Sequence, residues 1–196
     1  MKVTKLILGI LPFICAGCFG PQPPTPTYWP FSAQKTSHRA PVHKRDVVLG
    51  LNRIRVSAPY DSARFCVLRA DGSLAFDASN EFAARPSRAL MPLIEDVIRR
   101  FNFASQTTTD FNPSASMPQL TVEVKRLAVD CREKNHRKVI CDLKGTYKGA
   151  DGKVIICSDD ALIYLEDSDY GTAFSKVFVT ALEQVLRKMS DKILFP

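Results

Sequence analysis

Hydrophobic positions in this chain follow two different spacings, which change from segment to segment. Apolar and polar residues alternate along 120–131, 139–147 and 154–164, which predicts three consecutive strands. Near 90–101 the apolar residues recur every three or four positions, as they do on one face of a helix. A longer stripe of the same kind predicts a second helix over about 171–193.

The first half of the chain shows shorter strand patterns. Asp71-Gly72 separates two of them and is a typical pair for a tight hairpin turn. The segment 107–118 is rich in Thr, Ser, Asn and Pro, so we expect a loop there. The predicted short strands lie at 28–31, 47–56, 65–69 and 74–76.

Two local irregularities interrupt these patterns. The alternation that runs to Val124 resumes at Leu127 in the opposite phase, which predicts a β-bulge at Lys125-Arg126. Pro92 lies inside the first helical pattern and predicts either a late start or a kink, because proline cannot donate a backbone hydrogen bond.

The order of the predicted elements indicates the fold class. Strands come first, then a helix, three strands and a final helix. This order predicts an α+β fold, a two-layer sandwich whose largely antiparallel sheet carries two helices on one face. The length is enough for one well-buried domain, which we place at 27–196.

The first residues have the pattern of a secretory signal peptide. Lys2 and Lys5 precede a short apolar run, and the run ends at Cys15-Ala16-Gly17-Cys18. This ending resembles a bacterial lipobox, so we expect cleavage of a signal peptide at 1–17 and acylation of Cys18, detectable as bound palmitate. The Pro-rich segment 18–26 is expected to be an extended tether.

The net charge is +7, and removal of Lys2 and Lys5 lowers it to +5. A basic chain often binds nucleic acid, but an exported lipoprotein does not meet it, so we expect no nucleic-acid partner. Anionic lipid head groups or an acidic protein are better candidates, and a solvated basic surface is the simplest alternative.

The chain shows no catalytic motif such as a nucleophile elbow, a phosphate-binding loop or a helix-borne histidine pair. The spacing Cys131-x4-His136-x4-Cys141 lacks the tight ligand pairs of a zinc site. The carboxylates at 166–169 are better placed to cap the final helix. We therefore expect no enzyme activity, no cofactor and no metal.

Four cysteines remain after signal cleavage and acylation. Pairing Cys131 with Cys141 across the hairpin also places apolar residues of both strands on one face. We therefore predict a Cys131–Cys141 disulfide, with Val129 opposite Leu143. Cys66 and Cys157 would then be paired or remain as buried thiols, and the sequence does not choose between these.

Several segments together resemble a known family. The segments 55–61, with Ala58-Pro59-Tyr60, and 65–69 are followed by Phe82-Ala83-Ala84-Arg85-Pro86. With the lipobox, the tether and the aromatic start Tyr28-Trp29-Pro30-Phe31, their order is similar to that of the ABC-type transport auxiliary lipoproteins, the PqiC-like partners of MCE-domain transporters. Pro30 departs from the family's start motif.

The resemblance implies a non-enzymatic lipoprotein that helps an ABC permease, an ATPase and an MCE-domain protein to move phospholipid between inner and outer membranes. It implies the same α+β fold. The candidate partner contacts are Tyr60, Arg64 and Arg69, because Tyr and Arg are over-represented at interfaces. A homo-oligomer would raise the effective concentration for such contacts.

Two further expectations concern place and alternative function. Phe19 stands where Asp retains lipoproteins at the inner membrane of enteric bacteria, so we expect the outer membrane, with the domain in the periplasm. The alternative function is a structural envelope lipoprotein that tethers or activates a cell-wall or outer-membrane assembly complex.

Overall fold

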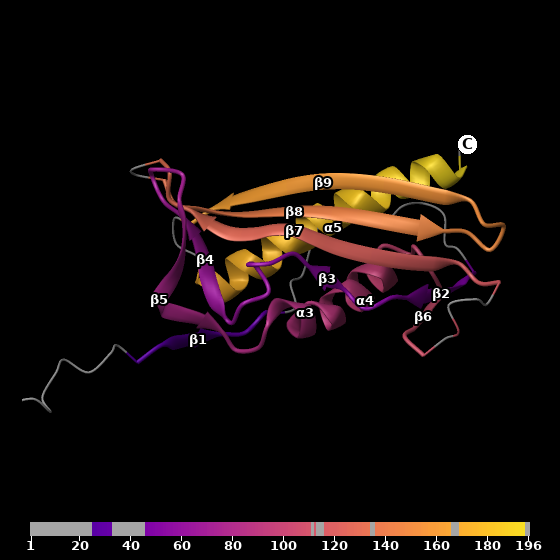
Figure 1. Ribbon diagram of the computed structural model, residues 1–196. Coiled ribbons are helices and arrows are strands. Elements are labelled where there is room, and N and C mark those ends of the chain that lie inside the picture. Colours follow the sequence, from indigo (N-terminus) through magenta and orange to yellow (C-terminus); the bar gives the residue numbers. More distant parts are fainter. Residues whose placement is uncertain are drawn as a thin grey trace, which may run out of the picture.

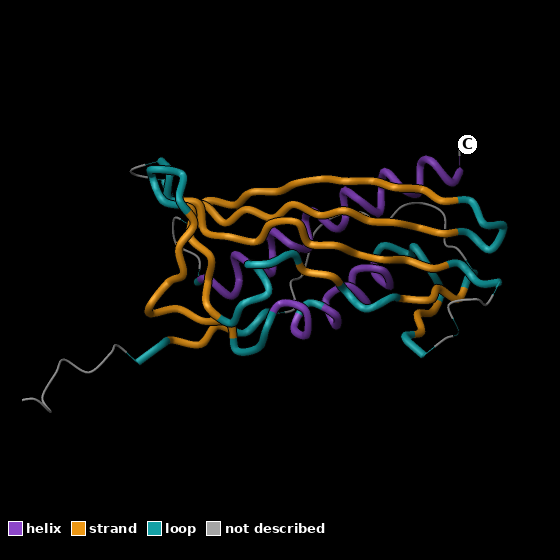
Figure 2. The backbone as a smooth tube through the Cα atoms, viewed as in Figure 1, coloured by secondary structure: helices purple, strands orange, loops and turns teal. Residues whose placement is uncertain are grey.

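The computed structural model describes residues 25–32, 46–110, 112, 116–133, 136–165 and 169–194 (Figures 1 and 2). The described residues form an α+β fold, as the sequence predicts. A mixed nine-stranded sheet packs against two helical segments, one bent and one long. The strands are β1 (Thr27–Trp29), β2 (Val48–Leu51), β3 (Arg55–Val56), β4 (Arg64–Leu68), β5 (Leu74–Phe82), β6 (Gln106–Thr108), β7 (Gln119–Asp130), β8 (Lys138–Lys148) and β9 (Val154–Tyr164). The helices are α3 (Pro86–Ala89), α4 (Met91–Arg100) and α5 (Tyr170–Leu194).

The long strand β7 organises the sheet. On one side it pairs along its whole length with β8, and β8 pairs with β9, so these three strands form an antiparallel meander. On its other side β7 pairs in turn with β2, β3 and β4, all of them parallel to it. The hairpin β4–β5 is antiparallel, and β1 runs parallel to β5 at the edge (Figure 1).

The sequence patterns fail at two places where strands are short. The predicted strand 47–56 is divided into β2 and β3, because four steps from Leu51 to Arg55 match only three on β7, from Leu120 to Glu123. The predicted loop 107–118 begins inside β6, which pairs with β2. Both strands depend on pairing with distant segments, which local composition does not reveal.

The irregularities inside the longer elements are confirmed. The register of β7 against β8 shifts between Val124 and Arg126, where the bulge was predicted. The first helix is broken at Leu90, which ends α3 and begins α4, and Pro92 follows in the first turn of α4. Proline is tolerated there because the first helical N–H groups need no partner within the helix.

The helix α5 begins at a capped end. The Asp169 carboxylate accepts hydrogen bonds from the Thr172 backbone N–H at 2.8 Å and from the Thr172 hydroxyl at 2.7 Å. These bonds hold the pKa of Asp169 below its usual range. The predicted capping role is therefore confirmed for Asp169, whereas residues 166–168 lie outside the described part.

The core fills the space between α5, α4 and one face of the sheet, which we call the inner face. Phe174, Phe178 and Met189 of α5 are fully buried against it. At Gly145 of β8 a Cβ atom would lie only 2.6 Å from a methyl group of Val185. Glycine at this position lets α5 lie directly on β8.

The predicted disulfide register is wrong. Cys141 lies opposite Leu127 rather than Cys131, and Val129 lies opposite Val139. Both thiols are free, and burial raises the pKa of Cys141. A shift of four residues keeps every apolar side chain on its face, so alternation could not distinguish the two registers. The shorter loop between β7 and β8 allows more strand residues to pair.

The strand β9 forms one edge of the sheet, and α5 covers part of that edge. Lys188 and Lys192 donate hydrogen bonds to the backbone carbonyls of Ser158 at 3.3 Å and Ile156 at 3.5 Å. Lys188 also lies 2.8 Å from the Asp159 carboxylate. Two backbone carbonyls of β9 therefore have partners on α5.

Candidate functional site

An apolar row crosses the face of the sheet that α5 does not cover, which we call the outer face. Strand register places Phe76, Cys66, Ala128, Ile140 and Leu162 side by side on β5, β4, β7, β8 and β9. The three central residues pack as a small cluster separate from the main core. We call these five residues the apolar row.

The two ends of the apolar row are open. Phe76 and Leu162 are each 48% exposed, whereas Cys66, Ala128 and Ile140 are buried. Tyr60 packs against the central cluster, and burial raises the pKa of the Cys66 thiol to about 11. That thiol therefore stays protonated near neutral pH and behaves as an apolar group.

The predicted partner contacts lie around this row. Tyr60 packs over its centre, and burial raises the pKa of the Tyr60 hydroxyl. Arg64 alternates with buried Phe65 and so points to the outer face, where it forms an ion pair with Glu81 at 3.4 Å. Arg69 is exposed at the start of the β4–β5 turn. The structure thus places all three near the same hairpin.

A second region joins the segments that carry the family resemblance. The Asp61 carboxylate accepts a hydrogen bond from the backbone N–H of Ser87 at 2.9 Å. The backbone N–H of Phe82 also donates to the carbonyl of Ala63. Segments 57–63 and 82–89 are therefore held side by side, and the peptide bond before Pro59 is cis.

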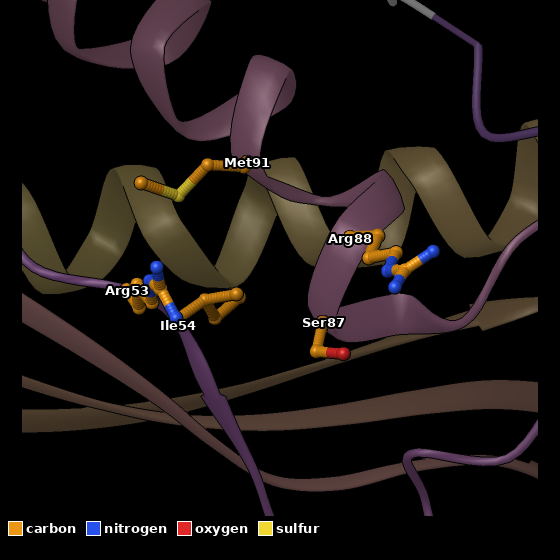
Figure 3. A pocket seen from close by; sticks show the side chains of 5 residues that line it. All are labelled: Arg53, Ile54, Ser87, Arg88 and Met91. Carbon is orange, nitrogen blue, oxygen red and sulfur yellow. The ribbon is translucent and has the colours of Figure 1, made fainter. Parts of the chain in front are cut away.

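Two cavities open beside this junction. One, of about 460 Å³, is lined by Arg53, Ile54, Ser87, Arg88 and Met91 (Figure 3). The other, of about 600 Å³, is lined by 83–85 together with Ser87 and Arg88. In Figure 3 the guanidinium group of Arg88 points away from Arg53, so the two charges are spread apart rather than aimed at one point.

Other sequence-predicted positions have plain structural surroundings or lie outside the described residues. Cys18 and the signal peptide 1–17 lie outside the described residues. The ring of His136 lies edge-on to the ring of Tyr164, with 6.2 Å between the ring centroids. Within the described ranges there is no group of three side chains suited to holding a metal ion. None of the helices described has the length and apolar character needed to cross a membrane.

No family model and no curated protein sequence matches this chain. Its structure is nevertheless similar to that of protein XCC0632 from Xanthomonas campestris, of the DUF330 family, with a TM-score of 0.65 and 16% identity. The match covers 84% of this chain and 92% of that one. The chain has the fold of a DUF330 protein.

Two other solved structures are similar to a different degree. The match to one uncharacterized protein covers 86% of this chain and 99% of that one, with a TM-score of 0.64 at 12% identity. The lipoprotein GNA1162 from Neisseria meningitidis reaches a TM-score of 0.31 at 9% identity, over 76% of this chain and 99% of its own. At 16% identity, the likeness to the DUF330 protein establishes the fold alone.

Sequence reasoning did not single out several residues of these two regions. Phe76 and Leu162 belong to strand patterns whose apolar positions all looked like core. The β4–β5 turn and the β8–β9 register together place them on the outer face. Arg53 and Arg88 stand in unremarkable local sequence, and only the tertiary contact between their segments brings them to one surface.

Proposed function

We propose that this chain is a lipid-anchored, non-enzymatic accessory protein that binds an MCE-type phospholipid transporter in the bacterial envelope. The observation that carries the proposal is the outer face, where an apolar row with two exposed ends lies beside Tyr60, Arg64 and Arg69. Exposed apolar surface rimmed by polar groups is typical of protein interaction sites.

The family resemblance suggests which partner covers this face. The segments that carry the resemblance are joined by the Asp61–Ser87 hydrogen bond, next to the start of β4. The likeness therefore involves a folded neighbourhood rather than scattered residues. The expected partner is the periplasmic part of an MCE-domain protein, working with an ABC permease and ATPase, and the accessory protein would be anchored through Cys18 at the outer membrane.

The geometry also suggests how binding would work. A partner can bury Phe76 and Leu162, the two exposed ends of the apolar row. The central cluster between them is already packed. Arginine at the border adds directional hydrogen bonds, which favour one orientation of the partner. A ring of transporter subunits would let several anchored copies bind together and so strengthen a modest interface.

Site-specific photo-cross-linking in cells tests this proposal. A photoreactive phenylalanine analogue replaces Phe76 or Leu162 on the outer face, and a matched control replaces Lys176, an exposed residue of α5. We expect an adduct with an MCE-domain protein from both outer-face positions and none from the control. Mass spectrometry of the adducts identifies the partner.

The same experiment separates the two candidate functions. Adducts with cell-wall synthases or outer-membrane assembly proteins, without any MCE-domain protein, would favour the structural alternative. Equal cross-linking from position 176 would show that the outer face is not the binding surface. Unchanged lipid asymmetry of the outer membrane after deletion of the gene would also contradict the transport role.

A further inference from the structure

Three arginines near the junction of segments 57–63 and 82–89 lack acidic partners among the described residues. Arg53, Arg85 and Arg88 are exposed and form no ion pair with a described carboxylate. Five other arginines lie 2.7–3.4 Å from an Asp or Glu oxygen, namely Arg64, Arg99, Arg100, Arg126 and Arg132. Elsewhere on the described surface, Arg55, Arg69, Arg137 and Arg187 are also exposed without an ion pair to a described carboxylate, so it is their position that distinguishes Arg53, Arg85 and Arg88. We call Arg53, Arg85 and Arg88 the arginine surface.

The layout of the arginine surface fits several separate anions better than one. Arg53 and Arg88 line the same cavity, but the Arg88 guanidinium points away from Arg53 (Figure 3). Arg85 lies beside the neighbouring cavity. A single phosphate would need converging donors. Spread charges over an apolar floor of Ile54 and Met91 suit a surface that carries many phosphates.

The start of the described chain lies on the same edge of the molecule. The backbone N–H of Ala83 donates to the carbonyl of Trp29 at 3.0 Å, which ties β1 to the segment leading into α3. In Figure 1, β1 and α3 both lie along the lower edge. Thr25 lies seven positions after Cys18, so even a fully extended tether reaches only about 25 Å.

We infer that the arginine surface docks the domain on an anionic membrane beside its own lipid anchor. The inference rests on the acylation of Cys18 in the proposed function, because the short tether brings this edge to the bilayer. A lipid chain combined with a basic patch holds a protein on a membrane more firmly than either alone. Docking would fix the orientation of the domain and leave the outer face free for a partner.

Trp29, the only tryptophan of the chain, gives a built-in reporter of docking. The full-length lipidated protein is reconstituted into vesicles of phosphatidylcholine, or of phosphatidylcholine with phosphatidylglycerol. Each preparation includes lipids with a nitroxide on the head group, which quench nearby tryptophan fluorescence. We expect stronger quenching of Trp29 with phosphatidylglycerol, and we expect added salt to weaken it because charges at the surface are screened.

Two charge-reversed variants test the arginines. Arg85→Glu with Arg88→Glu should lower the ratio of docked to undocked protein by on the order of tenfold or more, as expected for loss of two basic residues at an anionic surface. The matched control, Lys148→Glu with Lys153→Glu, makes the same change of charge at the β8–β9 turn, at the far end of the sheet (Figure 1). It should leave quenching as in the unchanged protein.

Several outcomes would overturn docking. Equal quenching of Trp29 with and without phosphatidylglycerol would do so. The same holds if the protein with Arg85→Glu and Arg88→Glu is quenched as strongly as the unchanged protein. If free glycerol phosphate abolished the difference at constant ionic strength, the arginines would be a site for a soluble anion instead. Absence of labelled palmitate on Cys18 would also overturn docking, because the lipid anchor brings this edge of the domain to the bilayer. Loss of docking with retained cross-linking to an MCE-domain protein would leave the proposed function standing.

Discussion

The two faces of the sheet carry apolar side chains in the same alternating pattern but in different surroundings. On the inner face Val122 and Leu143 are buried under α5 and α4. On the outer face Phe76 and Leu162 keep nearly half of their surface in contact with solvent. An apolar residue on the inner face therefore stabilises the fold, whereas one at an end of the apolar row is available to a partner.

Replacing one phenylalanine on each side gives the largest expected contrast. Phe174 is fully buried and contacts the rings of Phe65 and Phe82, each at a centroid distance of 4.8 Å. Phe174→Ala should lower the free energy of unfolding by about 3–5 kcal/mol, through lost burial and the cavity left behind. Urea denaturation followed by circular dichroism measures this loss.

Phe76→Ala is the matched variant on the outer face. Because Phe76 is half exposed, its truncation should cost about 1 kcal/mol or less, while it should weaken cross-linking from position 162. Similar losses of stability in the two variants would mean that the outer row belongs to the fold rather than to an interface.

A smaller effect is expected at Gly145, where α5 lies directly on the sheet. Gly145→Val would place side-chain atoms against Val185 and Met189, so the helix or the strand must move. We expect a loss of about 1–3 kcal/mol in the free energy of unfolding, as for other overpacked cores. Thr146→Val, one residue along on the outer face, should change it by only about 0.5 kcal/mol. An unchanged melting temperature for Gly145→Val would contradict this packing.

The smallest effect concerns the cap of α5. Asp169→Ala removes an acceptor for the Thr172 N–H and should cost about 1 kcal/mol near neutral pH, whereas Asp169→Ser should keep most of the cap. Because folding lowers the pKa of Asp169, its contribution is present above the pKa of the unfolded chain, about 3.9. It is lost as the pH falls through the lower, folded pKa. The difference between Asp169→Ala and the unchanged protein should therefore shrink in acid, as denaturation series at several pH values would show.

The sequence predicts the elements whose cause is local. Nearby residues determine three such features. These are the bulge at Lys125-Arg126, the break before Pro92 and the cap at Asp169. The strands β3 and β6 are too short to show a pattern of their own, and they form because β7 and β2 offer partners. The disulfide register was wrong because alternation repeats every two residues and cannot count how far one strand has slid along another.

The candidate site follows the same division. Tyr60, Arg64 and Arg69 were selected by residue type, and their placement around one hairpin comes from the fold. Arg53 and Arg88 are 35 positions apart in the sequence and share a cavity only because segment 82–89 folds back against segment 57–63. A contact of this kind has no periodic signal in a single sequence. The exposure of Phe76 could have been suspected from its place near a hairpin turn, but not distinguished from core.

The lysines on the edge of β9 have a consequence for crowding. Molecules held in the plane of a membrane meet their neighbours at high local concentration and in similar orientations. A free edge of eleven residues would then invite one sheet to continue into the next. Because Lys188 and Lys192 already donate to two of the carbonyls that such a union requires, copies anchored as proposed would gather densely and still remain separate folding units.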